Sequence, residues 1–220
     1  MASSPRSPKT YQAFLFDMDG TLITSTAAAE RVWTRWAERH SIDVAAFLPT
    51  MHGVRAADTI RKQNLPDIDL EAEIAWVERG EIEDVEGVVA IPGAIDFVKR
   101  LPPDRWAIVT SATVPLARAR LTAAGVTPPP VFITAEDVEH GKPDPAGYLK
   151  AAKALGVDIA DCIVFEDAEA GVQAGEAAGA DVVVITAAQQ HPLDTRWPEL
   201  ADYADAELKV SPEGGLTLGL

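Results

Sequence analysis

The stretch AFLFDMDGTL, residues 13–22, decides the fold, because an unbroken apolar run ends there in two acidic residues and a glycine. Four consecutive apolar residues without alternation are typical of a strand that is buried on both faces, as in a parallel sheet. Asp17 follows this strand directly, where a rigid backbone can present its carboxylate. Asp19 comes two residues later, and a chain turn at Gly20 would let both carboxylates face one site. Taken alone, such a DxDG turn is more often an ordinary or calcium-binding loop than a catalytic centre.

The same pattern recurs along the chain. Apolar runs end in a polar or acidic residue at 106–109, 131–133, 162–165 and 182–185. Segments with helical character, each followed by a glycine, lie between these runs at 115–124, 145–155 and 169–178. This alternation predicts an α/β fold with an open, parallel, Rossmann-like sheet and right-handed crossovers.

One long segment breaks the alternation. Residues 24–88 show helical spacing and no strong strand, and they contain Trp33, Trp36 and Trp76. Large aromatic side chains at such positions indicate packing between helices. We therefore expect a sheet domain made of residues 11–23 and 89–215, with a helical insertion after the first strand.

Polar side chains follow the predicted strands where each strand ends. In open α/β sheets, ligands bind outside the carboxyl ends of the strands, so these side chains should converge. They are Asp17, Asp19, Thr110, Ser111, Glu166 and Asp167. Crowded carboxylates repel one another unless some are protonated or a cation lies between them. Ligands that offer only oxygen favour a hard ion such as Mg²⁺, whose remaining positions a substrate phosphate commonly fills.

These residue types suit phosphoryl chemistry. The Asp17 carboxylate could attack phosphorus and form an aspartyl-phosphate. Asp19 could protonate the leaving oxygen and later deprotonate the attacking water. Thr110 and Ser111 could donate hydrogen bonds to phosphate oxygens, and Lys142 could offset the negative charge of nucleophile and phosphate.

Charge and composition exclude several classes of protein. The 220 residues are 47% hydrophobic and 24% charged, which is neither a disordered nor a membrane composition. The formal net charge of −15 excludes general nucleic-acid binding. The first ten residues lack the apolar stretch of a secretory signal, and the single Cys162 predicts a buried structural thiol in a reducing compartment. We expect a cytoplasmic monomer whose partner is a small phosphate ester, with no membrane or nucleic-acid partner.

The motifs, taken in order, resemble the haloacid dehalogenase superfamily of phosphohydrolases. They are DMDGTL at 17–22, the pair at 110–111, GKPDP at 141–145, and FED followed by AG at 165–171. The resemblance covers about residues 11–210. The segments FITAEDVEHGKPDPAGYLKAAKALG and HGVRAADTIR look closest to sugar- and polyol-phosphate phosphatases, including glycerol-phosphate and 2-deoxyglucose-6-phosphate phosphatases. The resemblance implies an Mg²⁺-dependent phosphatase that forms an aspartyl-phosphate, with residues 24–88 as an α-helical cap.

Roles carry over from the resemblance by position. Asp17 matches the nucleophile, and Asp19 matches the acid/base residue, which also offers its backbone carbonyl to Mg²⁺. Asp167 matches a metal ligand, with Glu166 a ligand directly or through water. Lys142 matches the family lysine.

At two other positions the match to the family pattern is ambiguous or incomplete. Thr110 matches the phosphate-binding hydroxyl, although the alignment can slip by one residue to Ser111. Some relatives have an acidic residue four positions after Asp167, where this chain has Gly171.

The predicted insertion contains the candidate specificity residues. His52, Gly53 and Arg55 lie in a loop that resembles the substrate-specificity loop of the family, where the glycine would allow a tight approach to substrate. His52 can equally be a surface histidine, and Arg55 a solvated charge at a helix start.

Two other functions fit the same residues. A phosphoglucomutase-like phosphotransferase would use this core and return the phosphate to the sugar. A non-catalytic phosphate-binding protein would be expected to lack the nucleophile or the lysine, and this chain has both.

Overall fold

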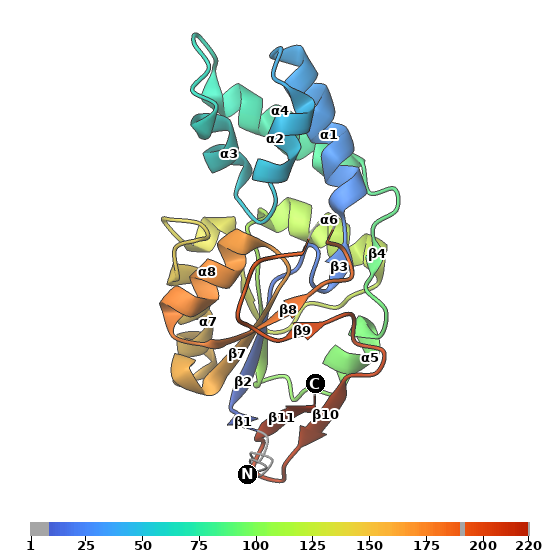
Figure 1. Ribbon diagram of the computed structural model, residues 1–220, viewed down its shortest axis with the longest axis vertical. Coiled ribbons are helices and arrows are strands. Elements are labelled where there is room, and N and C mark those ends of the chain that lie inside the picture. The colour runs from blue at the N-terminus through green and yellow to red at the C-terminus, as the bar shows by residue number, and fades with distance from the viewer. Residues whose placement is uncertain (1–8, 190–191, 220) are drawn as a thin grey trace.

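The computed structural model describes residues 9–189 and 192–219, and its centre is a six-stranded parallel sheet (Figure 1). The spatial order of the strands is β6-β5-β2-β7-β8-β9. Their bounds are β2 Ala13–Phe16, β5 Trp106–Val109, β6 Val131–Ile133, β7 Cys162–Glu166, β8 Asp181–Ile185 and β9 Glu199–Leu200. The first five of these strands begin or end within one residue of the apolar runs in the sequence, which confirms the predicted parallel α/β fold.

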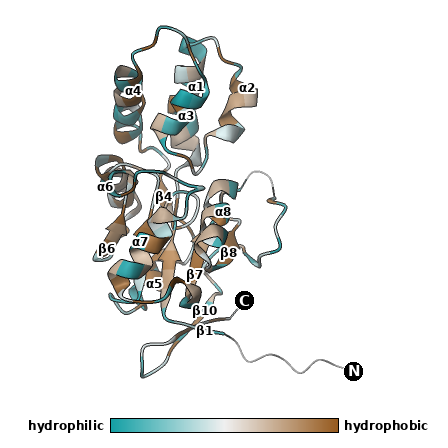
Figure 2. Ribbon diagram, turned by 90° about the vertical axis from the view of Figure 1, so that its left-hand side faces the viewer, coloured by the Kyte–Doolittle hydropathy of each residue, from teal (hydrophilic) through white to brown (hydrophobic). Residues whose placement is uncertain are grey.

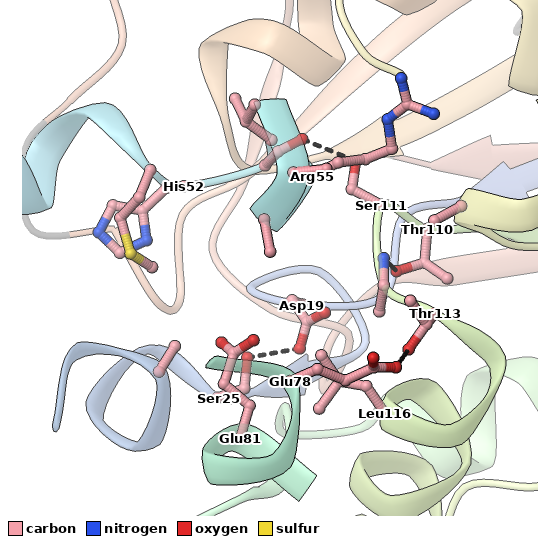
Figure 3. Close-up of a pocket in the computed structure, with 18 of the residues that line it drawn as sticks. Asp19, Ser25, His52, Arg55, Glu78, Glu81, Thr110, Ser111, Thr113 and Leu116 are labelled. Atoms are coloured by element: carbon pink, nitrogen blue, oxygen red, sulfur yellow. Dashed lines mark hydrogen bonds between the residues drawn. The ribbon is translucent and has the colours of Figure 1, made fainter. Parts of the chain in front are cut away.

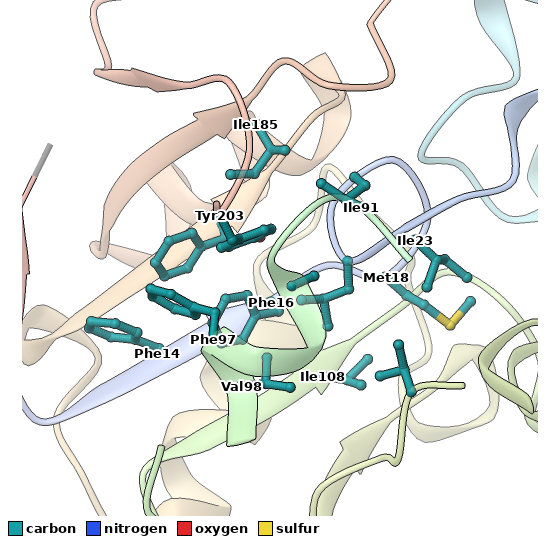
Figure 4. Close-up of a cluster of buried hydrophobic side chains, with 14 of the residues drawn as sticks. Phe14, Phe16, Met18, Ile23, Ile91, Phe97, Val98, Ile108, Ile185 and Tyr203 are labelled. Carbon is teal, nitrogen blue, oxygen red and sulfur yellow. The ribbon is translucent and has the colours of Figure 1, made fainter. Parts of the chain in front are cut away.

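Helices cover both faces of this sheet. They are α5 Ala94–Lys99, α6 Val114–Ala124, α7 Ala146–Leu155 and α8 Glu169–Ala178. Because side chains alternate along a strand, Phe14 and Phe16 of β2 enter one core with α5 and α6 (Figure 4), whereas Leu15 enters a second core with α7 and α8. The ring of Phe16 stacks on that of Phe165, 4.5 Å away. The strand that carries Asp17 is therefore fixed from both sides.

The segment between the first core strand and the rest of the sheet forms a separate helical layer at one end of the molecule (Figures 1 and 2). It consists of α1 Thr26–Arg39, α2 Val44–Phe47, a 3₁₀ turn at Leu48–Thr50, α3 Ala56–Lys62 and α4 Leu70–Glu83. Trp33 and Trp36 are buried in a hydrophobic cluster of its own, and Trp76 packs against that cluster. These tryptophans thus serve helix packing, as predicted.

The helical layer joins the sheet through two neighbouring connections. Strand β3 (Ile23–Thr24), which leads into α1, pairs antiparallel with β4 (Val89–Ala90), which leads back out of α4. We refer to residues 24–88 as the cap; these limits, and those of the core at 11–23 and 89–215, stay a prediction.

Several short elements were not predicted. A small antiparallel sheet, in the order β1-β11-β10, is built from Thr10–Tyr11, Leu216–Gly219 and Glu207–Val210. Two 3₁₀ turns lie at Ala135–Asp137 and Ile159–Asp161. Elements of two to four residues are too short to show a hydrophobic period, and tertiary contacts decide them. Most of the first ten residues, in which the sequence shows no secretory signal, lie outside the described residues. Within those residues, no helix is long and apolar enough to cross a membrane.

Candidate active site

A cavity of about 360 Å³ lies between the cap and the carboxyl ends of the core strands (Figure 3). The core contributes Asp17 and Asp19 from the segment after β2, Thr110 from the end of β5, and Asp167 from the end of β7. The cap contributes residues 51–57 and side chains of α1 and α4. The predicted site residues therefore gather at one place, as the parallel topology requires.

The turn after β2 brings Asp17 and Asp167 together. Asp17 is 4% exposed, and its backbone N–H donates to the carbonyl of Phe165 at 2.9 Å. Gly20 has φ of +82°, and a Cβ there would lie 1.9 Å from a carboxylate oxygen of Asp167. Glycine is required at this position for both its backbone conformation and the approach of that carboxylate.

Three carboxylates form a group that fits a cation. One oxygen each from Asp17, Glu166 and Asp167 lies within 4.8 Å of the others. Burial, followed by repulsion from neighbouring carboxylates, raises the pKa of Asp17 to about 8 even though Lys142 acts in the opposite direction. Burial and the charge of Asp17 likewise raise the pKa of Asp167 well above its usual range. A hard cation would relieve this repulsion, so the donor set fits Mg²⁺.

Lys142 lies beneath this group. Its ammonium donates to Asp17 Oδ1 and lies 2.6 Å from Glu166 Oε1. Burial disfavours the charged ammonium, but the carboxylates of Asp17 and Glu166 outweigh burial and raise the pKa of Lys142 above its usual value. The ammonium therefore stays charged next to the predicted nucleophile.

Glu166 is fully buried on the side of the group away from the cavity. Its Oε1 also accepts a hydrogen bond from the Tyr148 hydroxyl at 2.5 Å. Helix α8 passes so close that a Cβ at Gly171 would lie 1.9 Å from the Glu166 carboxyl carbon. The glycine that departs from the acidic pattern of some relatives is thus the residue that leaves room for Glu166.

Asp19 is oriented differently from the other carboxylates. Its Oδ1 accepts a hydrogen bond from the Ser25 hydroxyl at 2.5 Å and lies 3.0 Å from Nη1 of Arg120. Its side chain is not in the group of three that could hold a metal. The sequence predicts that four carboxylates gather at this end of the sheet, and the carboxylate of Asp19 lies apart from the other three. The metal role that the resemblance gives to the Asp19 backbone carbonyl stays a prediction.

The two predicted phosphate-binding hydroxyls have different surroundings. Thr110 is 5% exposed, lines the cavity, and accepts a hydrogen bond from the N–H of Ala112 at 3.1 Å. The Ser111 hydroxyl donates to the carbonyl of Gly53 in the cap at 2.9 Å. Because its donor is already used, Ser111 is less suited to a phosphate oxygen than Thr110.

The cap loop lies against the core. Gly53 has φ of +72°, and a Cβ there would lie 2.8 Å from the Ala168 side chain. His52 lines the cavity next to Glu30, 3.5 Å away, and burial lowers its pKa. Arg55 donates to the backbone carbonyls of Val138 and Glu139 at 3.3 and 3.0 Å. His52 is thus partly enclosed, and the Arg55 guanidinium docks the cap on the core.

Three residues of the site were not predicted from the sequence. Tyr148 supports Glu166, while Arg120 of α6 and Glu81 of α4 form a buried ion pair beside Asp19, with nitrogen and oxygen 2.9 Å apart. The sequence gives no sign of this ion pair. Arg118 and Arg120 lie two residues apart in the same helical segment, and only the fold exposes Arg118 and buries Arg120.

Comparison with known proteins establishes the family. The sequence model of the haloacid dehalogenase-like hydrolase family matches residues 11–179 of this chain. The chain therefore belongs to this family. Hexitol phosphatase A of Escherichia coli is 43% identical over 188 residues, covering 84% of this chain and 85% of that protein. The 2-deoxyglucose-6-phosphate phosphatase 1 of Saccharomyces cerevisiae is 35% identical over 215 residues, covering 88% and 87%.

Solved structures agree on the fold. CbbY from Rhodobacter sphaeroides, in complex with phosphate, superposes with a TM-score of 0.74 at 20% sequence identity and covers 89% of this chain and 96% of that one. The family-model match and the relatives named above confirm the resemblance to the haloacid dehalogenase superfamily that the motifs indicated.

Proposed function

We propose that the protein is an Mg²⁺-dependent phosphatase that hydrolyses monophosphate esters of small sugars or polyols through a phosphorylated Asp17. The observation that carries this proposal is the Asp17 carboxylate at the end of β2, which lines the cavity and lies beside Lys142 and two further carboxylates. The relatives named as hexitol and 2-deoxyglucose-6-phosphate phosphatases support it.

The proposed reaction has two steps. An oxygen of Asp17 bonds to phosphorus as the ester P–O bond breaks, and the electron pair of that bond goes to the leaving oxygen, which takes a proton from Asp19. Water then attacks the phosphorus of phospho-Asp17 and gives its proton to Asp19. The second P–O bond breaks, releasing phosphate and restoring the Asp17 carboxylate.

Other residues bind and orient the reacting groups. The Lys142 ammonium holds Asp17 Oδ1 in place, so the second carboxylate oxygen is left for the attack. Thr110 would bind a phosphate oxygen. Asp17, Asp167 and the Asp19 carbonyl would hold Mg²⁺, with Glu166 behind them, and the ion would supply positive charge against the phosphate. Burial of the carboxylate group supports this assignment.

The residues that line the cavity favour a substrate whose sugar or polyol part is uncharged and carries hydroxyl groups. Glu78, Glu136 and Glu139 line the cavity and can accept hydrogen bonds from hydroxyl groups. Each arginine that lines it already has a carboxylate partner within 3.0 Å: Arg55 and Arg61 pair with Asp58, and Arg120 pairs with Glu81. A second phosphate would meet mostly negative charge, which argues against a mutase that works through a bisphosphate.

The test is a phosphate-release screen with and without Mg²⁺. Glycerol phosphates, hexose, deoxyhexose and hexitol phosphates, and nucleotides would be compared, and we expect release from sugar or polyol esters that stops with chelator. The Asp17→Asn variant should fold and release no phosphate. If folded Asp17→Asn protein released phosphate as fast as the wild type, the proposed mechanism would be rejected. Isomerised sugar phosphate formed on addition of a bisphosphate would favour the mutase, and phosphate binding without turnover would favour the non-catalytic alternative.

The remaining expectations belong to the same proposal. We propose that the cap at 24–88 carries substrate selection through His52 and Gly53, and that Arg55 acts by docking the cap. Support comes from the position of the loop over the cavity. The monomeric state and the cytoplasmic location stay predictions from the sequence.

A further inference from the structure

A buried chain of charges connects the cap to Asp19. The guanidinium of Arg120, on core helix α6, lies 3.0 Å from Asp19 Oδ1 through Nη1 and donates to Glu81 Oε1 at 2.9 Å through Nη2. Arg120 and Glu81 are each 5% exposed. Glu81 belongs to cap helix α4, and it lines the cavity beside Asp19 and Ser25 (Figure 3). One guanidinium therefore contacts one carboxylate of each part of the protein.

The surroundings keep this arginine charged and in place. Burial works against its charge, but Asp19 and Glu81 outweigh burial and raise its pKa above the usual value. The planar guanidinium presents its N–H groups in a fixed geometry, so the direction of one arm determines the direction of the other. Its Nε is buried without a hydrogen-bond partner among the described residues, so the two Nη groups make the contacts that hold the guanidinium.

We propose that Arg120 is a positioning residue that aims the Asp19 carboxylate, and that Glu81 makes this aim depend on the docked cap. The inference rests on the proposed function, since it assumes that Asp19 protonates the leaving oxygen. Asp19 Oδ1 is held from two sides, by the Ser25 hydroxyl and by Arg120. Glu81 in turn fixes the direction of the Arg120 guanidinium. When the cap moves away from the core, Arg120 therefore loses one of its two carboxylate partners.

This position of Arg120 has a chemical consequence that depends on the leaving group. An alcohol leaves phosphorus slowly unless it is protonated, whereas 4-nitrophenolate leaves without a proton. The value of kcat/KM covers the reaction only up to departure of the leaving group, so it isolates this step from the later attack of water. Misplacing Asp19 should therefore lower kcat/KM for alkyl phosphates far more than for 4-nitrophenyl phosphate.

The first experiment measures Arg120→Met with both kinds of ester. The alkyl ester is glycerol 1-phosphate or 2-deoxyglucose 6-phosphate, whichever the wild-type enzyme hydrolyses faster. We expect kcat/KM for the alkyl ester to fall by about 10²-fold, because misplacement of a catalytic group by about 1 Å costs that much. The value for 4-nitrophenyl phosphate should change less than about 10-fold, since general acid help is the part that is lost. Arg118→Met, an exposed arginine on the same helix, is the matched control and should change neither.

The second experiment asks whether the cap acts through Arg120. Glu81→Gln keeps the shape of the side chain, and we expect it to lower the alkyl-to-aryl ratio of kcat/KM in the same direction by a smaller factor. In the Arg120→Met background, Glu81→Gln should have no further effect on this ratio, because its effect passes through the guanidinium. Glu83→Gln, at an exposed position of the same helix, is the control.

The outcomes separate this inference from the proposed function. Equal losses on both esters, or no loss on either, would overturn the role of Arg120. Additive effects of the two substitutions would overturn the dependence on the cap. If Arg120→Met does not fold, Glu81→Gln alone decides, and an unchanged ratio overturns the inference. Activity of Asp17→Asn would instead refute the proposed function itself.

Discussion

Replacing Gly171 by alanine should destabilise this protein, although a helical glycine is normally improved by alanine. Gly171 lies in the first turn of α8, and on helix propensity alone the change would stabilise the fold by up to about 1 kcal/mol. A Cβ there, however, would lie 1.9 Å from the carboxyl carbon of Glu166. Carbon atoms in contact prefer a separation of about 3.5–4.0 Å, so the carboxylate has to move by about 1.5 Å or the helix has to shift.

The surroundings of Glu166 determine the cost of that movement. Its carboxylate is fully buried, 2.5 Å from the Tyr148 hydroxyl and 2.6 Å from the Lys142 ammonium. Overpacking costs about 1–3 kcal/mol, and hydrogen bonds to charged groups contribute about 1.5–3 kcal/mol each. With the gain in propensity subtracted, we expect a net loss of about 2 kcal/mol, which lowers Tm by about 4–8 °C for a chain of this size.

The assay is thermal unfolding together with phosphate release. Because Lys142 contacts both Glu166 and Asp17, moving Glu166 should also displace the nucleophile, and turnover should fall by about 10²-fold, as expected when a catalytic group moves by about 1 Å. The control is Gly175→Ala in the same helix. A Cβ there would lie 3.0 Å from the side chain of Val182 and 3.2 Å from that of Val164, both buried. Gly175→Ala should therefore lower stability by overpacking but leave the turnover of the folded protein close to that of wild type, because it does not displace Glu166. A Gly171→Ala protein as stable and active as wild type would refute the close fit between α8 and Glu166.

Three further results are expected. Burial raises the pKa of Cys162 to about 12, so its thiol should stay protonated at pH 8. The thiol should then react with a disulfide reagent only after the protein unfolds, and rapid reaction of the folded protein would contradict this. Lys150 and Thr134 lower the pKa of Asp137, so Asp137→Asn should cost about 0.5 kcal/mol at pH 7. This difference should begin to shrink as the pH falls below the ordinary aspartate value of about 4 and should vanish only below the lowered pKa of folded Asp137; a difference in unfolding free energy that does not shrink in acid would contradict it. Mg²⁺ at 100 times its Kd should stabilise the folded state by about 2.7 kcal/mol over chelator-treated protein; an identical Tm in both would contradict a metal at Asp17.

The main strands and the position of the nucleophile could be predicted because they depend on local sequence. An apolar run followed by Asp17 specifies a buried strand with a carboxylate at its end, whatever the rest of the chain does. The helices at 115–124, 145–155 and 169–178 lie within one residue of the predicted bounds, because glycine ends each of them. Short elements, such as α2 and the antiparallel sheet near the termini, could not be predicted, since they hold together only through distant partners.

The sequence by itself determined the parallel sheet, the helical segment inserted after the first strand, and the family of hydrolases to which the chain belongs. Only the tertiary structure decided which contacts each of the site's side chains makes. Ser111 and Arg55 are engaged in docking the cap, the Asp19 carboxylate points to Arg120, and Gly171 makes room for Glu166. Each of these contacts joins elements far apart in sequence or depends on how a helix packs, so local propensity carries no information about it.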